Sequence, residues 1–337
     1  MNVLVAMSGG VDSSVAAALL LEAGHEVTGC TMRLWGGESD TGCCSVSDVD
    51  DARRVAQQLG IPHYVFDFGD DFAAGVVEPY VAAHAAGRTP NPCIECNRTV
   101  KFDRLLRRAD ALGFDALATG HHARVVAEGG HWHLRRAVDA AKDQSYVLHM
   151  LDQASLSRTL LPVGELTKAE VRVRAAALGL RTAAKPDSQD VCFITKGGRE
   201  SFLARRLELT PGRVIDTSGA QVGTVEAVQL VTIGQRRGLG MAGGSDPRYV
   251  VDVEGDTVTV GTAGDLLVDG VELTDVTWVD GPVAGEVLVQ CSAHGRPRPA
   301  TFDGTTVRWA TPAPRVAPGQ SVVLYAGDTV LGGGLAA

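Results

Sequence analysis

The sequence predicts an α/β protein in which a parallel-sheet domain is followed by two small all-β domains. Short β-rich runs alternate with helical patterns over roughly the first 200 residues, which is typical of βαβ units and a parallel sheet. After about Leu209 the helical periodicity disappears, and short alternating runs separated by Gly, Asp and Pro take its place. A serine–glycine turn joins the first strand to the first helix, at the sheet edge where such folds bind ligands.

The predicted elements are spread in order along the chain. In the first part we expect strands at 3–7, 26–34, 63–68 and 115–119, and helices at 12–23, 47–59, 97–112 and 167–178. Two of the helices open with residues in capping-box spacing, Ser47 with Asp50 and Thr167 with Glu170. In the second part we expect strands at 222–231, 249–253, 257–260 and 287–292. The predicted domains are residues 1–203, 204–262 and 263–337.

Composition narrows the class of protein. The chain has 337 residues, 45% of them hydrophobic and 21% charged, which is ordinary for a water-soluble globular protein. No apolar run approaches the roughly 20 residues that cross a bilayer, and the start lacks the basic region of a signal peptide. We therefore expect a cytoplasmic protein with no membrane partner. The net charge of −9 argues against a protein that coats nucleic acid, but it permits local basic patches.

The turn at Ser8 to Ser13 reads SGGVDS and has the features of an anion site. Its two glycines allow a tight turn that brings backbone N–H groups against an anion, and the helix N-terminus that comes next adds its positive dipole end. The two serines can donate hydroxyl hydrogen bonds, and Asp12 can hold Mg²⁺ on a phosphate. A serine cap on a glycine turn is the simpler alternative, which six motif residues at the first strand–helix junction make less attractive.

This stretch resembles the PP-loop, SGGxDS, of the N-type ATP pyrophosphatases. The sequence has no Gly-Lys-Ser/Thr, which excludes a Walker A loop. Enzymes of the PP-loop superfamily cleave ATP between the α and β phosphates and transfer AMP to an oxygen of the substrate. The resemblance implies ATP with Mg²⁺, but it leaves the substrate open, because amidotransferase synthetases and tRNA thiolases both carry the motif.

Three of the seven cysteines lie where reactive groups are expected. Cys93 and Cys96 belong to a proline-rigid loop that leads into the predicted helix at 97–112, whose N-terminal dipole and basic residues favour a thiolate. Cys192 comes after a polar loop. Cys30 and Cys291 lie in apolar strand patterns and are expected to be buried small hydrophobes.

Two other uses of the Cys93 and Cys96 pair are weaker. A structural zinc site needs four ligands, usually two such pairs, and the sequence has no second CxxC. A thioredoxin-like redox pair would need the first strand, which already leads into the nucleotide loop.

Five motifs in order resemble those of the bacterial tRNA-uridine 2-sulfurtransferases, the tRNA 2-thiouridylase family. They are NPCIECN, ATGHHAR, KDQSY, DSQDVCFI and GQRRGLG, and the resemblance extends from Val3 to Gly334. It implies a PP-loop (adenine nucleotide alpha hydrolase-like) domain, a small central β domain and a C-terminal β-barrel. It also implies tRNA as the substrate.

The resemblance assigns roles to individual positions. It makes Cys96 the nucleophile and Cys192 the cysteine that carries a persulfide. It places ATP at Ala6, Met7, Ser8, Gly9, Gly10, Val11, Asp12, Ser13, Met32 and Gly120. It places the target base at Asn91, Pro92 and Cys93, and other parts of the tRNA at His121, Lys142, Asp143, Gln144, His294, Gly295 and Gln320. The chain departs from the family pattern around His294, which has SAHGRPRP in place of an Arg-Tyr-Arg cluster, and at position 93, which is often Asp.

The implied reaction is adenylation of the C2 oxygen of a wobble uridine in the anticodon region, followed by sulfur transfer. Cys96 and Cys192 would then close a disulfide that a cellular reductant reopens. A cysteine desulfurase or a sulfur relay protein would supply the persulfide. Basic residues recur on the predicted helix and in later loops, where they favour contact with RNA phosphates: Arg98, Lys101, Arg104, Arg108, Arg236, Arg237, Arg296 and Arg298.

Three alternatives stay open at this point. Cys93, Cys96 and Cys192 could together hold a [4Fe–4S] cluster, although a persulfide relay needs no metal and is preferred. A PP-loop amidotransferase or ligase would use the adenylate on an amine, but no glutaminase-like region is visible. A non-catalytic RNA-binding protein would not need cysteines in two separate polar loops.

Overall fold

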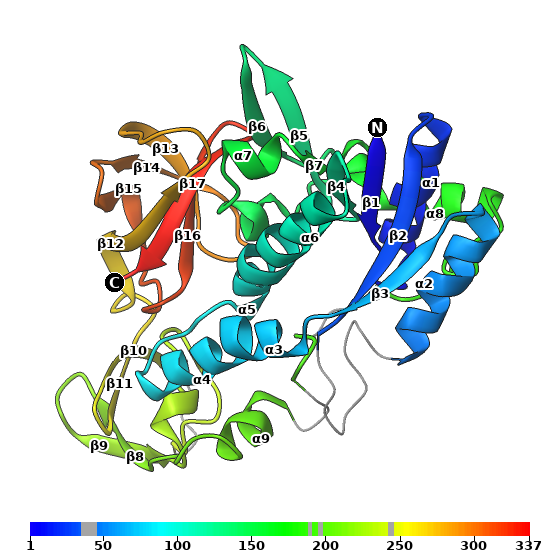
Figure 1. Ribbon diagram of the computed structural model, residues 1–337. Coiled ribbons are helices and arrows are strands. Elements are labelled where there is room, and N and C mark those ends of the chain that lie inside the picture. The colour runs from blue at the N-terminus through cyan, green and yellow to red at the C-terminus, as the bar shows by residue number, and fades with distance from the viewer. Residues whose placement is uncertain (35–45, 188–190, 195–197, 242–245) are drawn as a thin grey trace.

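A parallel sheet and a β-barrel make up the two ends of the molecule, and a helical segment runs between them (Figure 1). The computed structural model describes residues 1–34, 46–187, 191–194, 198–241 and 246–337. Cys43 and Cys44 lie outside the described residues. Within the described ranges, no helix is long and apolar enough to cross a membrane.

The parallel sheet has the strand order β3-β2-β1-β4-β7. Its strands are β1 (Asn2–Ala6), β2 (Glu26–Arg33), β3 (His63–Asp67), β4 (Ala116–Thr119) and β7 (Thr159–Leu160). Successive residues of a strand face opposite sides, so Val3 and Val5 of the central β1 pack into one hydrophobic cluster and Leu4 into another. Helices α1 (Val11–Glu22), α2 (Val46–Leu59) and α8 (Lys168–Ala177) contribute to the first of these clusters. A sheet buried on both faces places its loops, and therefore its ligands, at the strand ends.

One helical stretch packs on the other face and a second packs against the first, and both differ from the prediction. The stretch predicted at 97–112 begins five residues earlier and consists of α5 (Pro92–Glu95), the π-helix η2 (Cys96–Arg104) and α6 (Leu105–Ala111). Proline is favoured in the first turn of a helix, and the Asn91 side chain caps this one by accepting from the Cys93 N–H at 3.0 Å. Cys96 therefore lies inside the helix, and the expectation that it immediately precedes one was wrong. The stretch α3 (Gly69–Phe72), η1 (Ala73–Val77) and α4 (Glu78–Ala85) was not among the predicted elements.

Of the two predicted capping boxes, one is confirmed and the other is wrong. Thr167 caps α8 as predicted, with Glu170 completing a capping box. Helix α2 begins at Val46, so Ser47 lies inside the helix and does not precede it.

The second half is rich in β-strands, as predicted, but the strand expected at 222–231 was wrong in its second part, because β9 ends at Val225 and the short 3-10 helix η5 (Val228–Leu230) follows. A four-stranded sheet has the order β10-β11-β8-β9, formed by β8 (Gly212–Asp216), β9 (Gln221–Val225), β10 (Tyr249–Glu254) and β11 (Thr257–Gly261). The last part closes into a six-stranded barrel, because β12 pairs with both β15 and β17. Its strands are β12 (Leu267–Trp278), β13 (Gly285–Gln290), β14 (Arg298–Phe302), β15 (Thr306–Pro314), β16 (Ser321–Ala326) and β17 (Thr329–Ala336). The predicted fold class is confirmed; the domain boundaries at 203 and 262 remain predictions.

One hairpin crosses between the two halves. Strands β5 (Ala123–Glu128) and β6 (His131–Arg136) come from the first half of the chain but extend the barrel sheet, where Arg135 pairs with Thr329 of β17. The remaining short elements are η3 (Ser145–Leu148), α7 (Gln153–Leu156), η4 (Pro162–Glu165), α9 (Gly198–Ala204) and η5 (Val228–Leu230).

Candidate active site

The loop between β1 and α1 has the geometry of an anion cradle. Gly9 has a φ of +72°, a conformation that glycine adopts without strain, and Gly10 is the N-cap of α1. The Ser8 N–H donates to the Ser13 hydroxyl at 3.2 Å and closes the turn. Gly120, at the end of β4, packs so closely that a Cβ there would lie 2.5 Å from the Ser13 nitrogen. Two predicted ATP positions far apart in the chain are therefore in contact.

Asp12 in this loop is held by two donors that the motif did not reveal. The Lys168 ammonium lies 2.7 Å from both carboxylate oxygens, and the buried His122 places Nε2 3.1 Å from Oδ1. Burial alone would raise the pKa of Asp12, but the hydrogen bonds from His122 and Lys168 outweigh it and keep that pKa below its ordinary value. Asp12 is therefore an anion held at the N-terminus of α1.

The same ammonium also contacts the segment that carries Cys192. Lys168 Nζ lies 2.9 Å from Asp187 Oδ1, and Lys142 and Arg172 each place a nitrogen 2.8 Å from the same carboxylate. Burial opposes ionisation of Asp187, yet the hydrogen bonds from Lys142 and Lys168 lower its pKa to about 2. The nucleotide loop and the segment before Cys192 thus share one network of charges.

A second lysine supports the loop from the other side. Lys185 Nζ donates to the Gly9 carbonyl at 3.0 Å and to Asp48 and Asp51 of α2 at 2.6 and 2.8 Å. Desolvation alone would lower the pKa of Lys185, but these two carboxylates raise it. We did not predict Lys168, Lys185 or His122. Sequence signals existed for all three: Lys168 comes directly after a capping threonine, Lys185 lies just before the DSQDVC motif and His122 belongs to ATGHHAR.

The three residues of the KDQ motif, expected to touch tRNA, each make an internal contact. Lys142 pairs with Asp187, and the Gln144 side chain accepts from the His122 N–H at 2.9 Å. Asp143 is nearly buried against Arg136, at 2.8 Å, and also accepts from the backbone N–H of Ala137 and Ser145. This motif ties the barrel side of the molecule to the nucleotide loop.

His121, another expected tRNA contact, packs against Phe102 and places Nδ1 2.7 Å from the Thr119 hydroxyl. Burial, with the nearby positive charge of Lys101, holds the pKa of His121 well below its ordinary value. The side chain is therefore neutral at physiological pH.

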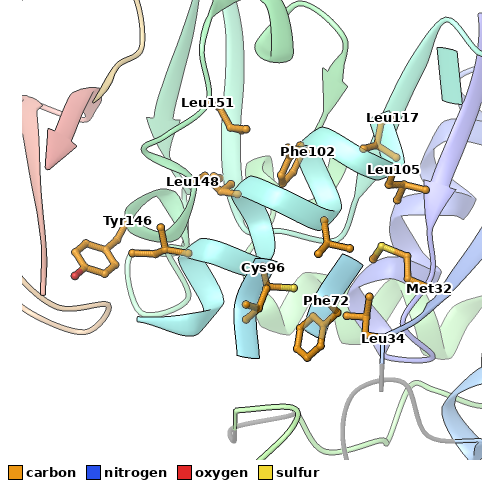
Figure 2. Packing of buried hydrophobic residues seen from close by; sticks show 14 of the residues in the cluster. Met32, Leu34, Phe72, Cys96, Phe102, Leu105, Leu117, Tyr146, Leu148 and Leu151 are labelled. Carbon is orange, nitrogen blue, oxygen red and sulfur yellow. The ribbon is translucent and has the colours of Figure 1, made fainter. Parts of the chain in front are cut away.

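Cys96 and Cys192 pack on one hydrophobic cluster. Cys96 is 6% exposed and lies among Met32, Leu34 and Phe72 (Figure 2). Cys192 is partly buried against the same cluster, and the next residue, Phe193, places its ring 5.6 Å from that of Phe72. Met32, a predicted ATP residue, thus lies on the same cluster as the two predicted catalytic cysteines.

Cys93 differs in being exposed, on the first turn of α5. Cys30 is buried in β2 as predicted, and its burial raises the pKa of its thiol. Cys291 is partly buried, and burial raises the pKa of its thiol to about 12. Among the described residues, no group of three or more His, Cys, Asp or Glu side chains is placed to hold a metal ion.

A pocket at one end of the barrel is lined by two of the other predicted tRNA residues. It has a volume of about 400 Å³ and is lined by Gly295, Gln320 and Arg298 among others. His294 is exposed beside Gly295. The adjoining turn contacts the loop that leads to Asn91, since the Thr89 N–H donates to the Pro318 carbonyl at 2.7 Å. The segments that lead to the expected base-binding residues and to Gln320 are therefore in contact.

Comparison with known proteins identifies the family. A family model described as the tRNA methyl transferase HUP domain matches residues 1–196. Models described as the tRNA methyl transferase PRC-barrel domain and the aminomethyltransferase beta-barrel domain match 200–262 and 268–336. The tRNA-specific 2-thiouridylase MnmA of Chloroflexus aurantiacus is 49% identical, over 99% of this chain and 97% of its own length. The chain belongs to the tRNA-specific 2-thiouridylase family. The protein of the same name from Salinispora tropica is 48% identical, over 98% of this chain and 97% of its own.

Solved structures give more distant likenesses. The U34-tRNA thiolase NcsA from Methanococcus maripaludis with its [4Fe-4S] cluster is 18% identical, covers 60% of this chain and 63% of its own, and has a TM-score of 0.39.

Proposed function

We propose that the chain is an ATP-dependent sulfurtransferase that converts a wobble uridine of tRNA to 2-thiouridine. The observation that carries the proposal is the ionic connection between the two motifs. Asp12 of the nucleotide loop and Asp187, five residues before Cys192, contact the same lysine ammonium. An enzyme that activates a base with ATP and then delivers sulfur to it needs these two groups side by side.

The first step is activation of the uridine. Its C2 oxygen attacks the α phosphorus of ATP, a new P–O bond forms, the bond to the β phosphate breaks and pyrophosphate leaves. The N3 proton of the uridine is lost, which leaves a neutral adenylated base. Backbone N–H groups at the start of α1 and the Ser8 and Ser13 hydroxyls are suited to binding the phosphates.

The second step is sulfur transfer. Cys192 carries a persulfide, and the Cys96 thiolate attacks the Cys192 sulfur, so that the persulfide bond breaks and a hydrosulfide is released. Hydrosulfide adds at C2, AMP leaves and the proton that came with the sulfur ends on N3. A disulfide between Cys96 and Cys192 remains, and a two-electron thiol reductant restores both thiols. Burial of Cys96 supports the proposal, because it keeps water from the thiol that releases the hydrosulfide.

Magnesium on the phosphates belongs to the proposal, but Asp12 does not fit that role as it stands. Both of its oxygens lie 2.7 Å from the Lys168 ammonium. A Mg²⁺ ion bound mainly by phosphate oxygens and water needs no such ligand. Neither step of the proposed reaction depends on Asp12 as a metal ligand.

The proposed tRNA contacts lie along the side that joins the barrel to α5. Asn91, Pro92 and Cys93 would meet the target base in the anticodon region, and the pocket beside Gln320 would take a neighbouring part of the loop. Arginines at positions 296, 298 and 315 line that pocket, and their charge suits RNA phosphates on a chain that is acidic overall. We propose a cytoplasmic location and a persulfide donor protein, such as a cysteine desulfurase or a relay protein, as the second partner.

The test is reconstitution of the purified chain with unmodified tRNA, ATP and a persulfide source. We expect 2-thiouridine and AMP to appear together, both dependent on tRNA. Both should be lost in Asp12→Ala, because Asp12 fixes the phosphate-binding turn through its contacts with His122 and Lys168. AMP without any thiolated nucleoside, or an amidated product in the presence of ammonia, would contradict the proposal. Stoichiometric iron and sulfide after anaerobic purification, lost in Cys93→Ser together with activity, would replace the persulfide route with a cluster.

A further inference from the structure

Lys168 occupies a position in the charge network that no other described cation shares. Its side chain is 12% exposed and its ammonium contacts Asp12 and Asp187, whose side chains are 29% and 23% exposed. Lys142 and Arg172 contact Asp187 but, among the described residues, are not paired with Asp12. Without Lys168, two carboxylates on separate segments would face each other with no cation between them, and like charges at short range repel.

The Asp187 contact matters because Asp187 lies on the segment that leads to Cys192. Phe193, directly after Cys192, is 2% exposed and packs edge-on against Phe72, Tyr80 and Phe202, with ring centroids 5.1 to 5.6 Å apart. The cysteine therefore has an aromatic anchor on its C-terminal side. On its N-terminal side the nearest charged anchor among the described residues is Asp187, five positions earlier.

Lys168 is itself held rigidly. It is the first residue of α8, directly after the capping threonine, and its backbone N–H donates to Asp139 at 2.9 Å. A rigid backbone on a packed helix gives the long lysine side chain a fixed origin, as a positioning group requires.

We propose that Lys168 is a positioning residue for sulfur transfer, which ties the nucleotide loop through Asp12 to the Cys192 segment through Asp187. This inference rests on the proposed function. The described side-chain contacts of Lys168 are to carboxylates, so its removal is expected to separate the two half-reactions. Adenylation continues at saturating ATP, but the adenylate meets water more often than sulfur.

The experiment compares Lys168→Met, which keeps the length of the side chain without its charge, with Lys168→Arg, which keeps the charge. Arg174→Met is the matched control, because Arg174 lies on the same helix and pairs with Glu22 at the surface. Two quantities are measured at saturating ATP: AMP formed per 2-thiouridine, and the rate at which iodoacetamide alkylates Cys192 in the persulfide-free enzyme without tRNA. In Lys168→Met we expect the amount of AMP formed per 2-thiouridine to rise at least tenfold and the alkylation rate of Cys192 to rise at least fivefold. Lys168→Arg should recover most of both, and Arg174→Met should match the unaltered chain.

A rise in the KM for ATP with an unchanged AMP ratio and an unchanged alkylation rate would overturn the inference, because it would confine Lys168 to the nucleotide site. If Lys168→Met is too unstable to assay, Asp187→Asn provides a second test. It weakens the contact between Lys168 and Asp187 and leaves Asp12 paired with Lys168. Faster alkylation of Cys192 in Asp187→Asn supports the link, and an unchanged rate contradicts it. The alkylation assay needs no tRNA, so it separates failure of this link from failure of the proposed function, which would appear as absence of 2-thiouridine from the unaltered chain.

Discussion

At the scale of single residues, the Lys168 ammonium joins the nucleotide loop to the segment before Cys192, because it contacts both Asp12 and Asp187. The PP-loop letters pointed to Asp12, and the family motifs pointed to Cys96 and Cys192. The partner of Asp12 lies 156 positions away in the sequence, on a helix with no motif of its own. Pairing of that kind depends on the way the sheet brings α1 and α8 together, which no local pattern encodes.

Asp187 gives this network a pH dependence. Burial opposes its ionisation, but contacts with Lys142 and Lys168 lower its pKa from 3.8 to about 2. A carboxyl whose pKa falls on folding stabilises the fold above the unfolded pKa, and the contribution is lost as pH falls through the folded one. We expect Asp187→Asn to lower the free energy of unfolding at pH 7 by on the order of 1 kcal/mol after solvent screening. The difference should shrink between about pH 4 and pH 2. Urea unfolding across this range measures it, with Asp269→Asn on the exposed side of β12 as control; a difference independent of pH would exclude the ionic origin.

At the scale of elements, two errors of the prediction arose at helix starts. The helix that carries Cys96 was expected to start at Asn97 because two prolines precede it, but Pro92 occupies the first helical position, where its missing N–H is not needed. The ends of β1 and β4 were predicted to within a residue or two. A strand that is buried on both faces has a continuous run of apolar residues, and the ends of that run mark the ends of the strand.

The N-terminal cap of α8 fixes the backbone from which the Lys168 side chain extends. The Thr167 hydroxyl accepts from the Glu170 N–H at 3.3 Å, and the Glu170 carboxylate accepts from the Thr167 N–H at 2.7 Å. Loss of the cap leaves a helix N–H without its partner, so we expect Thr167→Ala to lower the free energy of unfolding by about 1 kcal/mol. Thr167→Ser keeps the hydroxyl and should lie within a few tenths of a kcal/mol of the unaltered chain. Equal stabilities of the Ala and Ser variants in urea unfolding would show that the box contributes nothing.

At the scale of the whole molecule, the loss of helical periodicity after about Leu209 predicted the β-rich second half. The six-stranded barrel confirmed the C-terminal β-barrel that the family resemblance implied. The hairpin β5–β6 was not predicted, since its partner β17 lies near the other end of the chain. Arg124 of that hairpin contacts Asp328 at 2.7 Å across 204 positions of sequence. Arg136 closes the same joint by stacking over the Tyr325 ring at 3.8 Å, so the barrel is fixed against the catalytic half.

An acidic chain that binds tRNA must concentrate its positive charge. Arg236 and Arg237 are exposed in the loop of the GQRRGLG motif. If both contact phosphates, the slope of log affinity for tRNA against log salt should become shallower by roughly one to two units in Arg236→Ala with Arg237→Ala. Filter binding at several salt concentrations measures this slope, with Arg174→Ala as the control. An unchanged slope in the double variant would remove these arginines from the interface.

The central claim is that one chain activates the base with ATP and then delivers sulfur from Cys192. A single-turnover assay of Cys192→Ser with tRNA, ATP and a persulfide donor tests it most directly, with the unaltered chain as the reference. We predict that Cys192→Ser forms pyrophosphate and an adenylated tRNA, from which water in place of sulfur releases AMP, but no 2-thiouridine, whereas the unaltered chain forms all three products. A normal yield of 2-thiouridine from Cys192→Ser would contradict the account.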